Sequence, residues 1–406
     1  MPFVICAVPW FNEVATDLLA AIVALPDVRL GVLSQAPLEE LAPQVRAGVV
    51  AHRRVGDLRD AGKIAAAARE LADRHGPIHR LFGPQEQLQA PLAEARERLG
   101  VAGMGVEAAR NFRDKARMKE RFRAAGLPCA RHRLAASEAE AWRFAEEAGY
   151  PLVVKPPAGA AAQATFRAGT PDELRAALAT APPAPGREVL LEEFITGEEH
   201  SFDTFSLDGR HVWHSLTRYL PPPLEVLRTP WIQWRVVLPR EVDAPAYDDI
   251  RAMAYRALDA LGMDTGLSHL EWFRRGDGSL AISEVAARPP GAQITKLMSL
   301  AHDFDCTAAW ARLMIHGAFD PPARRYAAGA AYLRGQGTGR VVAIHGWEQA
   351  RRELGALLAE AKLPALGQAA SGGYEGEGYV LLRHPDTAVV TEALLRLITT
   401  VRVELG

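Results

Sequence analysis

Two glutamates near the middle of the chain are spaced so that a β-hairpin would place them side by side. Residues 267–273 and 280–285 are predicted strands, and the Asp-Gly dipeptide between them is a strong signal for a two-residue turn. That turn would pair Glu271 with Glu284, with Cβ atoms roughly 5 Å apart. Because like charges repel, the pair indicates a bridging cation, and Mg²⁺ prefers such oxygen ligands when it also holds a nucleotide phosphate. An ordinary hairpin with solvated glutamates is the alternative.

Basic residues lie on either side of this hairpin in contexts that suit an anionic substrate. Lys155 closes a short apolar strand, so its ammonium could emerge from the strand end toward phosphate as a point charge. Lys115 lies in a predicted basic helix over residues 111–126, where Lys119, one turn later, competes for the same role. A solvated helix face is the alternative for Lys115. Arg288 lies just downstream of the hairpin.

The composition is that of a soluble globular protein with more than one core. A chain of 406 residues predicts two or three domains. The net charge of −2 indicates no nucleic-acid or membrane-surface partner, and no apolar run reaches the ~18 residues that a membrane span needs. The first residues lack the basic region and cleavage site of a secretory signal. Cys6, Cys129 and Cys306 give neither a disulfide framework nor a metal spacing, so we expect a cytoplasmic protein.

Three regions must position these residues. The first ~110 residues alternate short apolar strands with helices, which predicts a parallel sheet covered on both faces. No GxGxxG follows the first strand, so a dinucleotide site is not supported. Residues 127–196 read as a compact α+β module with a small-residue loop at residues 159–165. A helix over residues 247–261 leads into the hairpin, and a helix over residues 347–361 lies among Gly-punctuated strands.

Taken in order, these motifs resemble those of the ATP-grasp carboxylate–amine ligases, and most of all the L-amino-acid ligases and the biotin carboxylase-like members. The shared order is a helical lysine, a second lysine 40 residues later, a small-residue loop, an acidic hinge strand and a Glu…Glu-x-x-x-Arg pair. The resemblance implies an α/β and α+β multidomain ATP-grasp fold. It would comprise a Rossmann-like pre-domain (1–110), an ATP-grasp domain (111–320) with a lid subdomain (about 127–196), and a closing subdomain (321–406).

The resemblance also implies how the nucleotide would be held. Glu192 would accept a hydrogen bond from the adenine amino group, the backbone of Glu193 and Ile195 would contact the ring edge, and Glu199 would bind the ribose hydroxyls. The loop at residues 159–165 would cover the phosphates. It carries alanines where the family has more glycine, so fewer of its residues can adopt a positive φ, and we expect a stiffer lid.

The resemblance further implies which residues would contact the ATP phosphates, the metal ion and the acyl-phosphate intermediate. Lys115 and Lys155 would contact the ATP phosphates, and Glu271 and Glu284 would hold one or two Mg²⁺, for which Mn²⁺ could substitute. Arg288 would steady an acyl phosphate, so Arg288 and Lys155 are the predicted catalytic residues.

The reaction implied is transfer of the ATP γ-phosphoryl group to a carboxylate, followed by attack of an amine on the acyl phosphate. We expect an amino acid as one substrate, with His269, Arg218 and Arg228 predicted to contact it. A homodimer is expected by analogy only. A bicarbonate-using carboxylase is one alternative. A non-catalytic ATP-binding module is another, indicated by the alanine-rich loop and by Ala286 where the family usually has an asparagine ligand.

Overall fold

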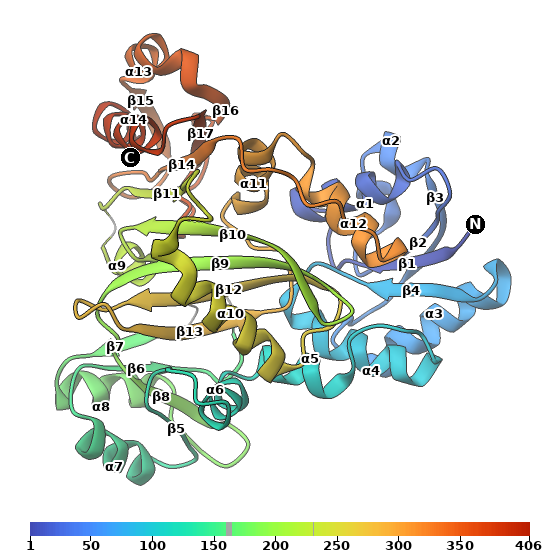
Figure 1. Ribbon diagram of the computed structural model, residues 1–406, viewed down its shortest axis with the longest axis horizontal. Coiled ribbons are helices and arrows are strands. Elements are labelled where there is room, and N and C mark those ends of the chain that lie inside the picture. The colour runs from blue at the N-terminus through green and yellow to red at the C-terminus, as the bar shows by residue number, and fades with distance from the viewer. Residues whose placement is uncertain (160–164, 230) are drawn as a thin grey trace.

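The computed structural model describes residues 1–159, 165–229 and 231–406. It begins with a four-stranded parallel sheet in the order β3-β2-β1-β4, which confirms the predicted parallel sheet (Figure 1). Its elements are β1 (Phe3–Ala7), α1 (Glu13–Val23), β2 (Arg29–Ser34), α2 (Pro43–Arg46), β3 (Val49–Arg54), α3 (Ala61–His75), β4 (Ile78–Phe82) and α4 (Gln89–Leu99). The strand order reverses between β1 and β4, and open parallel sheets bind ligands in the crevice at such a point.

The single basic helix predicted over residues 111–126 is wrong, because two helices occupy this region. They are α5 (Val106–Arg113) and α6 (Lys115–Ala124). Asp114 separates them with an extended backbone, and its carboxylate accepts hydrogen bonds from the amides of Ala116 and Arg117 at 2.9 and 3.1 Å. That is an N-cap, which ends one helix and starts the next. Lys115 therefore lies at the first position of α6.

A sheet of eight strands forms the centre of the molecule, in the order β13-β12-β9-β10-β11-β14-β17-β16. Its first five strands are β9 (Glu198–Leu207), β10 (Arg210–Leu220), β11 (Trp234–Leu238), β12 (Gly266–Arg274) and β13 (Leu280–Ala286). Helix α10 (Asp248–Leu261) packs on one face through a core that includes Phe202, Leu270 and Trp272 (Figure 1). Because successive residues of a strand point to opposite faces of the sheet, the residues next to these three in sequence point to the face away from α10. The short helix α9 (Pro223–Arg228) lies between β10 and β11.

A second, smaller sheet holds the predicted lid module, in the order β5-β8-β6-β7. Its elements are β5 (His132–Ala135), α7 (Glu138–Ala148), β6 (Leu152–Lys155), β7 (Phe166–Ala168), α8 (Pro171–Thr180) and β8 (Val189–Glu193). The apolar sides of α7 and α8 pack on this sheet around Phe144, Leu152 and Leu174. The module has its own small core, separate from that of the central sheet.

The C-terminal region continues the central sheet. Strands β14 (Ala327–Leu333), β16 (Leu358–Lys362) and β17 (Gly378–His384) extend it, while β15 (Val341–His345) and β18 (Arg402–Leu405) pair separately. The remaining helices are α11 (Ile294–His302), α12 (Cys306–His316), α13 (Trp347–Leu354) and α14 (Thr387–Thr400). The helix predicted over residues 347–361 is too long, since α13 ends at Leu354 and β16 follows.

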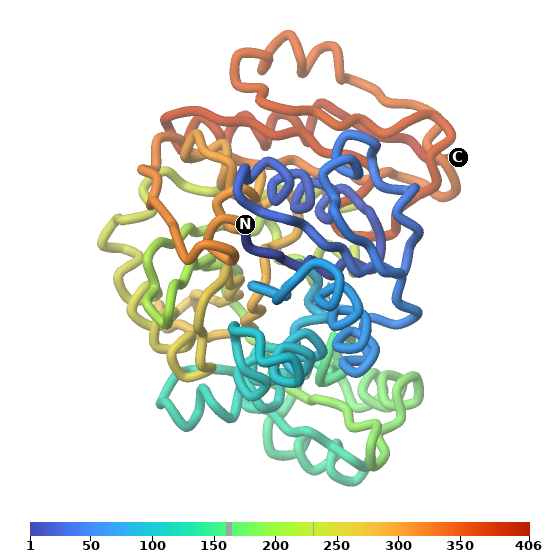
Figure 2. The backbone as a smooth tube through the Cα atoms, turned by 90° about the vertical axis from the view of Figure 1, so that its right-hand side faces the viewer, coloured from blue at the N-terminus to red at the C-terminus, as the bar shows by residue number. Residues whose placement is uncertain are grey.

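The three regions surround a common centre. Figure 2 shows the N-terminal sheet against the middle of the molecule, with the C-terminal strands at one end and the small sheet at the other. Within the described parts of the chain, no helix combines the length and the apolarity that crossing a bilayer requires.

Candidate active site

A cavity of about 850 Å³ lies where the three regions meet. Its walls are the face of the central sheet opposite α10, the segments after β1 and β4, the ends of β6 and β8, and the segment after β13. Of the predicted site residues, eleven line it: Lys115, Lys155, Glu192, Glu193, Ile195, Glu199, Arg228, His269, Glu271, Glu284 and Arg288. Residues 160–164 of the predicted phosphate loop lie outside the described residues.

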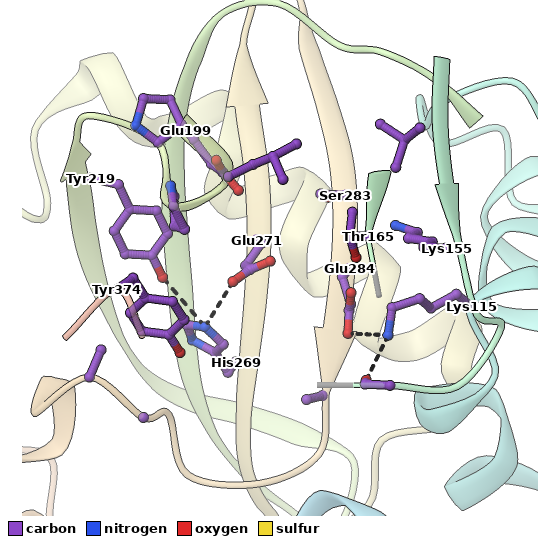
Figure 3. Close-up of a pocket in the computed structure, with 18 of the residues that line it drawn as sticks. Lys115, Lys155, Thr165, Glu199, Tyr219, His269, Glu271, Ser283, Glu284 and Tyr374 are labelled. Carbon is purple, nitrogen blue, oxygen red and sulfur yellow. Dashed lines mark hydrogen bonds and ion pairs between the residues drawn. The ribbon is translucent and has the colours of Figure 1, made fainter. Parts of the chain in front are cut away.

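Glu271 and Glu284 are paired across β12 and β13, as predicted, but by a different route. The hairpin does not turn at a two-residue loop, because Arg274 pairs with Leu280 and the Arg275 amide bonds the Ser279 carbonyl at 2.8 Å. With this turn alone, Glu271 would lie opposite Ser283, one residue away from the predicted partner. A β-bulge at Ser283 adds one residue to β13 and restores the pairing, so both carboxylates point into the cavity (Figure 3).

The cavity holds three carboxylates close together. Burial and the neighbouring Glu271 raise the pKa of Glu199 well above its ordinary value. Burial acts the same way on Glu271, but His269, at 3.6 Å, lowers the pKa of Glu271 below its ordinary value. Glu284 pairs with the ammonium of Lys115 at 2.7 Å. Negative charge is thus concentrated at Glu271 and Glu284, where it is only partly balanced.

The three lysines of the site divide between two acidic partners. Lys115 contacts Glu284 and also donates to the carbonyl of Gly159 at 2.9 Å. Lys155 lies 3.0 Å from one oxygen of Glu192, and Lys119 lies 3.3 Å from the other. Burial opposes ionisation of Lys155, but Glu192 raises the pKa of its ammonium, so it stays charged. Both predicted phosphate lysines therefore reach the cavity, each beside an acidic partner.

The predicted adenine hinge lines the cavity between β8 and β9. The amide of Glu193 donates to the carbonyl of Arg131 at 3.0 Å, whereas no backbone hydrogen bond among the described residues uses the amide of Ile195. Burial opposes ionisation of Glu192, yet Lys119 and Lys155 lower its pKa. Its Oε1 has no hydrogen bond of good geometry within the described residues. A buried acceptor and an amide without a backbone partner among the described residues, both at the wall of one cavity, fit the edge of an adenine ring, so the hinge fits ATP.

Arg288 is held by a residue that the sequence did not single out. Glu86, in the loop after β4, accepts from Arg288 at 2.8 and 3.0 Å with one oxygen and from Arg113 at 2.6 Å with the other. Burial opposes ionisation of Arg288, but Glu86 raises the pKa of the guanidinium. Arg113 in turn donates to the carbonyl of Gly159 at 3.0 Å. Glu86 thus links the predicted catalytic arginine to the start of the predicted phosphate loop.

His269 lies beneath Glu271 in a buried polar network (Figure 3). Its Nδ1 lies 2.6 Å from Asp203 and its Nε2 lies 3.4 Å from the hydroxyl of Tyr219. Burial lowers the pKa of His269, but Asp203 and Glu271 outweigh it and raise it to about 9. The imidazolium is therefore the neutral-pH form, and it contributes a fixed positive charge behind the carboxylates.

The structure separates the two arginines predicted to contact substrate. Arg228, on α9, lines the cavity. Arg218 does not, because its neighbour Tyr219 is the residue of β10 that faces the cavity and strand residues alternate. Arg218 is exposed on the other face, where its guanidinium contacts the hydroxyl of Tyr247. A substrate role for Arg218 therefore has no support from its position.

Tyr374 is a further cavity residue that the sequence did not indicate. It comes from the loop before β17, and its ring meets Trp234 edge-on at 4.9 Å. Trp234 also stacks on Tyr332 at 4.5 Å. The rings of Trp234 and Tyr374 form an aromatic wall of the cavity, and Tyr332 packs on Trp234 without lining it.

The acidic pair also meets the requirements of a divalent cation. Glu271 and Glu284 supply two oxygen ligands on one sheet face, and Mg²⁺ in nucleotide sites takes one or two carboxylates and completes its shell with phosphates and water. No cluster of three or more His, Cys, Asp or Glu suited to a metal occurs among the described residues. Ala286, which lines the cavity, supplies no side-chain oxygen. The residues therefore fit a phosphate-bound Mg²⁺.

Three comparisons with known proteins agree with this geometry. The ATP-grasp domain family matches residues 120–293. An L-arginine-specific L-amino acid ligase of Bacillus subtilis is 26% identical over 228 residues, which cover 55% of this chain and 54% of that protein. The chain thus spans about half the length of this curated relative.

Solved structures show the same architecture over the whole chain. An L-amino acid ligase from Bacillus licheniformis superposes with a TM-score of 0.79 at 17% identity, covering 100% of this chain and 99% of that one. An N5-carboxyaminoimidazole ribonucleotide synthetase from Thermotoga maritima gives a TM-score of 0.71 at 16% identity, with 100% of each chain covered. At these identities the likeness shows the fold. The chain contains an ATP-grasp domain, and the predicted ATP-grasp fold is confirmed.

Proposed function

We propose that this protein is an ATP-dependent ligase that joins the carboxylate of one substrate to the amine of another, with an amino acid as one of the two. ATP would transfer its γ-phosphoryl group to the carboxylate oxygen, which gives an acyl phosphate and ADP. The amine nitrogen would then attack the acyl carbon, form the C–N bond, expel phosphate and lose a proton. The ATP-grasp domain and the L-amino acid ligase relative support this reaction class.

The chain's own part in such a reaction is positioning and charge neutralisation. Lys115 and Lys155 would contact the phosphates, and Glu192, Ile195 and Glu199 would hold the adenine and ribose. Glu271 and Glu284 would hold Mg²⁺, which neutralises phosphate charge when bound. No covalent enzyme intermediate is needed.

The Arg288–Glu86 pair is the observation that carries the amino-acid assignment. The two residues present opposite charges to the same cavity, 2.8 Å apart and largely buried. An α-amino acid is a zwitterion, so its carboxylate can pair with Arg288 while its ammonium pairs with Glu86. The ligand would thus replace the Arg288–Glu86 pair by two ion pairs of its own, and neither protein charge would be left unpaired. A substrate without an amino group lacks the second contact.

Arg228 and the aromatic wall complete the proposal for the other substrate. Arg228 is an exposed cation at the cavity wall, so we assign it to a substrate carboxylate. The rings of Tyr374 and Trp234 would contact the substrate's apolar part. His269 lies behind Glu271 and would act on substrate only through the charge it places there.

A bicarbonate-using carboxylase is the second candidate, favoured by the likeness to the N5-carboxyaminoimidazole ribonucleotide synthetase fold. One experiment separates the candidates: phosphate release from MgATP, with the twenty amino acids singly and in pairs and with bicarbonate alone. Release that requires one amino acid with a second amine supports the ligase and names both substrates. Release with bicarbonate alone supports the carboxylase. No release from any mixture, with ATP still bound, refutes both reactions in favour of a binding module.

A further inference from the structure

Lys119 is a completely buried lysine at the edge of the proposed nucleotide site. Its exposed fraction is 0%, and it lies one turn after Lys115 on α6. Lysine is almost never fully buried unless its ammonium is paired. Its partners are the carbonyl of Ser283 at 2.9 Å and a carboxylate oxygen of Glu192 at 3.3 Å. Both are protein groups, so this ammonium is already engaged before any ligand binds.

The Ser283 carbonyl belongs to the β-bulge of β13. β13 is an edge strand of the central sheet, so its outer backbone groups need partners from outside the sheet. The amide of Ile282 donates to the carbonyl of Pro128 at 2.9 Å, and the carbonyl of Ser283 accepts from Lys119. The outer side of the bulge is therefore held by α6 and by the segment that follows it.

The bulge determines where Glu284 points. Without the bulge, the pairing that begins with Arg274 and Leu280 would continue along both strands. Ser283 would then lie opposite Glu271 in place of Glu284. A shift of one residue moves a side chain to the other face of the sheet. A contact that holds the bulge therefore also holds the carboxylate pair.

The second partner of Lys119 lies on the other sheet. Glu192 belongs to β8 and shares its carboxylate between Lys119 and Lys155. One ammonium thus joins the hairpin that carries the proposed metal ligands to the strand that begins the proposed adenine hinge. The side chain of Lys115, by contrast, points toward Glu284 at the cavity surface (Figure 3).

From these contacts we propose that Lys119 is a positioning residue for the metal pair: it fixes the Ser283 bulge, keeps Glu284 beside Glu271, and fixes the distance between this pair and the adenine hinge. The proposal rests on the proposed function, because it concerns how the same site holds MgATP. It predicts that, when Lys119 is replaced, a higher Mg²⁺ concentration is needed to strengthen ATP binding.

The test is calorimetric titration of ATP into Lys119→Met at a series of Mg²⁺ concentrations, with circular dichroism to show that the variant is folded. We expect the Mg²⁺ concentration that gives half of the maximal strengthening of ATP binding to rise about 10- to 100-fold, the usual effect of losing a group that orients a metal ligand. Lys119→Arg keeps a cationic donor and should recover most of this response. Arg121→Met is the matched control, since Arg121 is on the same helix, is exposed, and pairs with Glu107; its response should equal that of the wild type.

Glu192→Gln separates the two partners of Lys119, because it removes the carboxylate charge that Lys119 and Lys155 share at the hinge and leaves the contact of Lys119 with the Ser283 carbonyl in place. ATP binding should weaken in this variant both with and without Mg²⁺, and the half-maximal Mg²⁺ concentration should stay unchanged. If folded Lys119→Met shows the wild-type Mg²⁺ response, the positioning role is refuted while the proposed function stands. If Lys119→Met does not fold, Lys119→Gln, which keeps a neutral donor, is measured by the same criterion. Wild-type protein that binds no ATP, or binds it without a Mg²⁺ effect, refutes the proposed function and this role with it.

Discussion

The charge on His269 provides a prediction that depends on neither substrate. Burial alone would lower the pKa of His269, but Asp203 at 2.6 Å and Glu271 at 3.6 Å raise it to about 9. The ordinary pKa of histidine is about 6.5, so the folded protein favours the imidazolium by about 2.5 pKa units, or about 3 kcal/mol. Replacing Asp203 with asparagine removes the largest favourable contribution and leaves only Glu271 to oppose burial.

The sign of the resulting pH dependence follows from the direction of the shift. Because the pKa of His269 is higher in the folded than in the unfolded state, the stabilisation is fully present below about pH 6.5. It is lost as the pH rises toward 9, where the folded protein also releases the proton. We therefore expect the free energy of unfolding of the central region to fall by up to about 3 kcal/mol across this interval, and by much less in Asp203→Asn.

The direct measurement is an NMR titration of histidine ring protons in ligand-free protein, with His269→Gln used to assign the resonance. The His269 resonance should titrate near pH 9 in the wild type and at a lower pH in Asp203→Asn. Urea unfolding at pH 6.5 and pH 9 then tests the linkage. A wild-type His269 resonance that titrates below pH 7 would refute the reasoning, since it would mean that desolvation outweighs both carboxylates.

Three further substitutions test other parts of the site. Glu284→Ala should lower ATP turnover at least about 100-fold with the fold retained, as shown by circular dichroism; turnover at the wild-type rate would refute the metal assignment. Glu86→Gln should raise the KM of the amino-acid substrate about tenfold or more, and the KM of ATP by less, because it removes the charge that holds Arg288 and would meet the substrate ammonium, while Arg113 keeps its contact with the Gly159 carbonyl; an unchanged KM of the amino acid would refute this assignment. Gly197→Ala should weaken ATP binding and lower stability by more than about 1 kcal/mol, measured by titration and urea unfolding, because φ is +151° there and a Cβ would lie 2.3 Å from the Arg274 carbonyl oxygen.

The hairpin shows how far a local pattern predicts structure. Alternation and the Asp-Gly signal located both strands and the Glu271–Glu284 pair, but the loop is longer than the two-residue turn that the pattern indicated. The pairing survives because the bulge at Ser283 compensates for that loop. The bulge is anchored by Lys119, a residue 164 positions away. A pattern read over neighbouring residues has no access to such a contact.

The same limit explains the residues that the sequence did not indicate. Glu86 and Tyr374 reach the cavity from regions that flank the ATP-grasp domain, and nothing in their local sequence marks them. Topology does give a signal for Glu86, because the loops after β1 and β4 lie where the strand order reverses, and such a crevice is a general ligand site. For Tyr374 no comparable signal exists, since its loop is positioned by the long-range pairing of β14 with β17.

The choice between Lys115 and Lys119 required the helix boundary. Both residues are basic, and one turn apart they lie on one face of α6, so periodicity alone cannot distinguish them. Asp114 caps α6 and places Lys115 at its first position, beside the cavity and Glu284. Lys119, one turn deeper, meets the sheet edge and is buried there. A single capping residue thus separates a lysine that can meet phosphate from one whose ammonium is committed to the protein. Removing the cap with Asp114→Ala should therefore displace both lysines, so that ATP affinity and its response to Mg²⁺ both change. A substitution of Lys115 or of Lys119 alone should not reproduce the effect of the other on these two quantities.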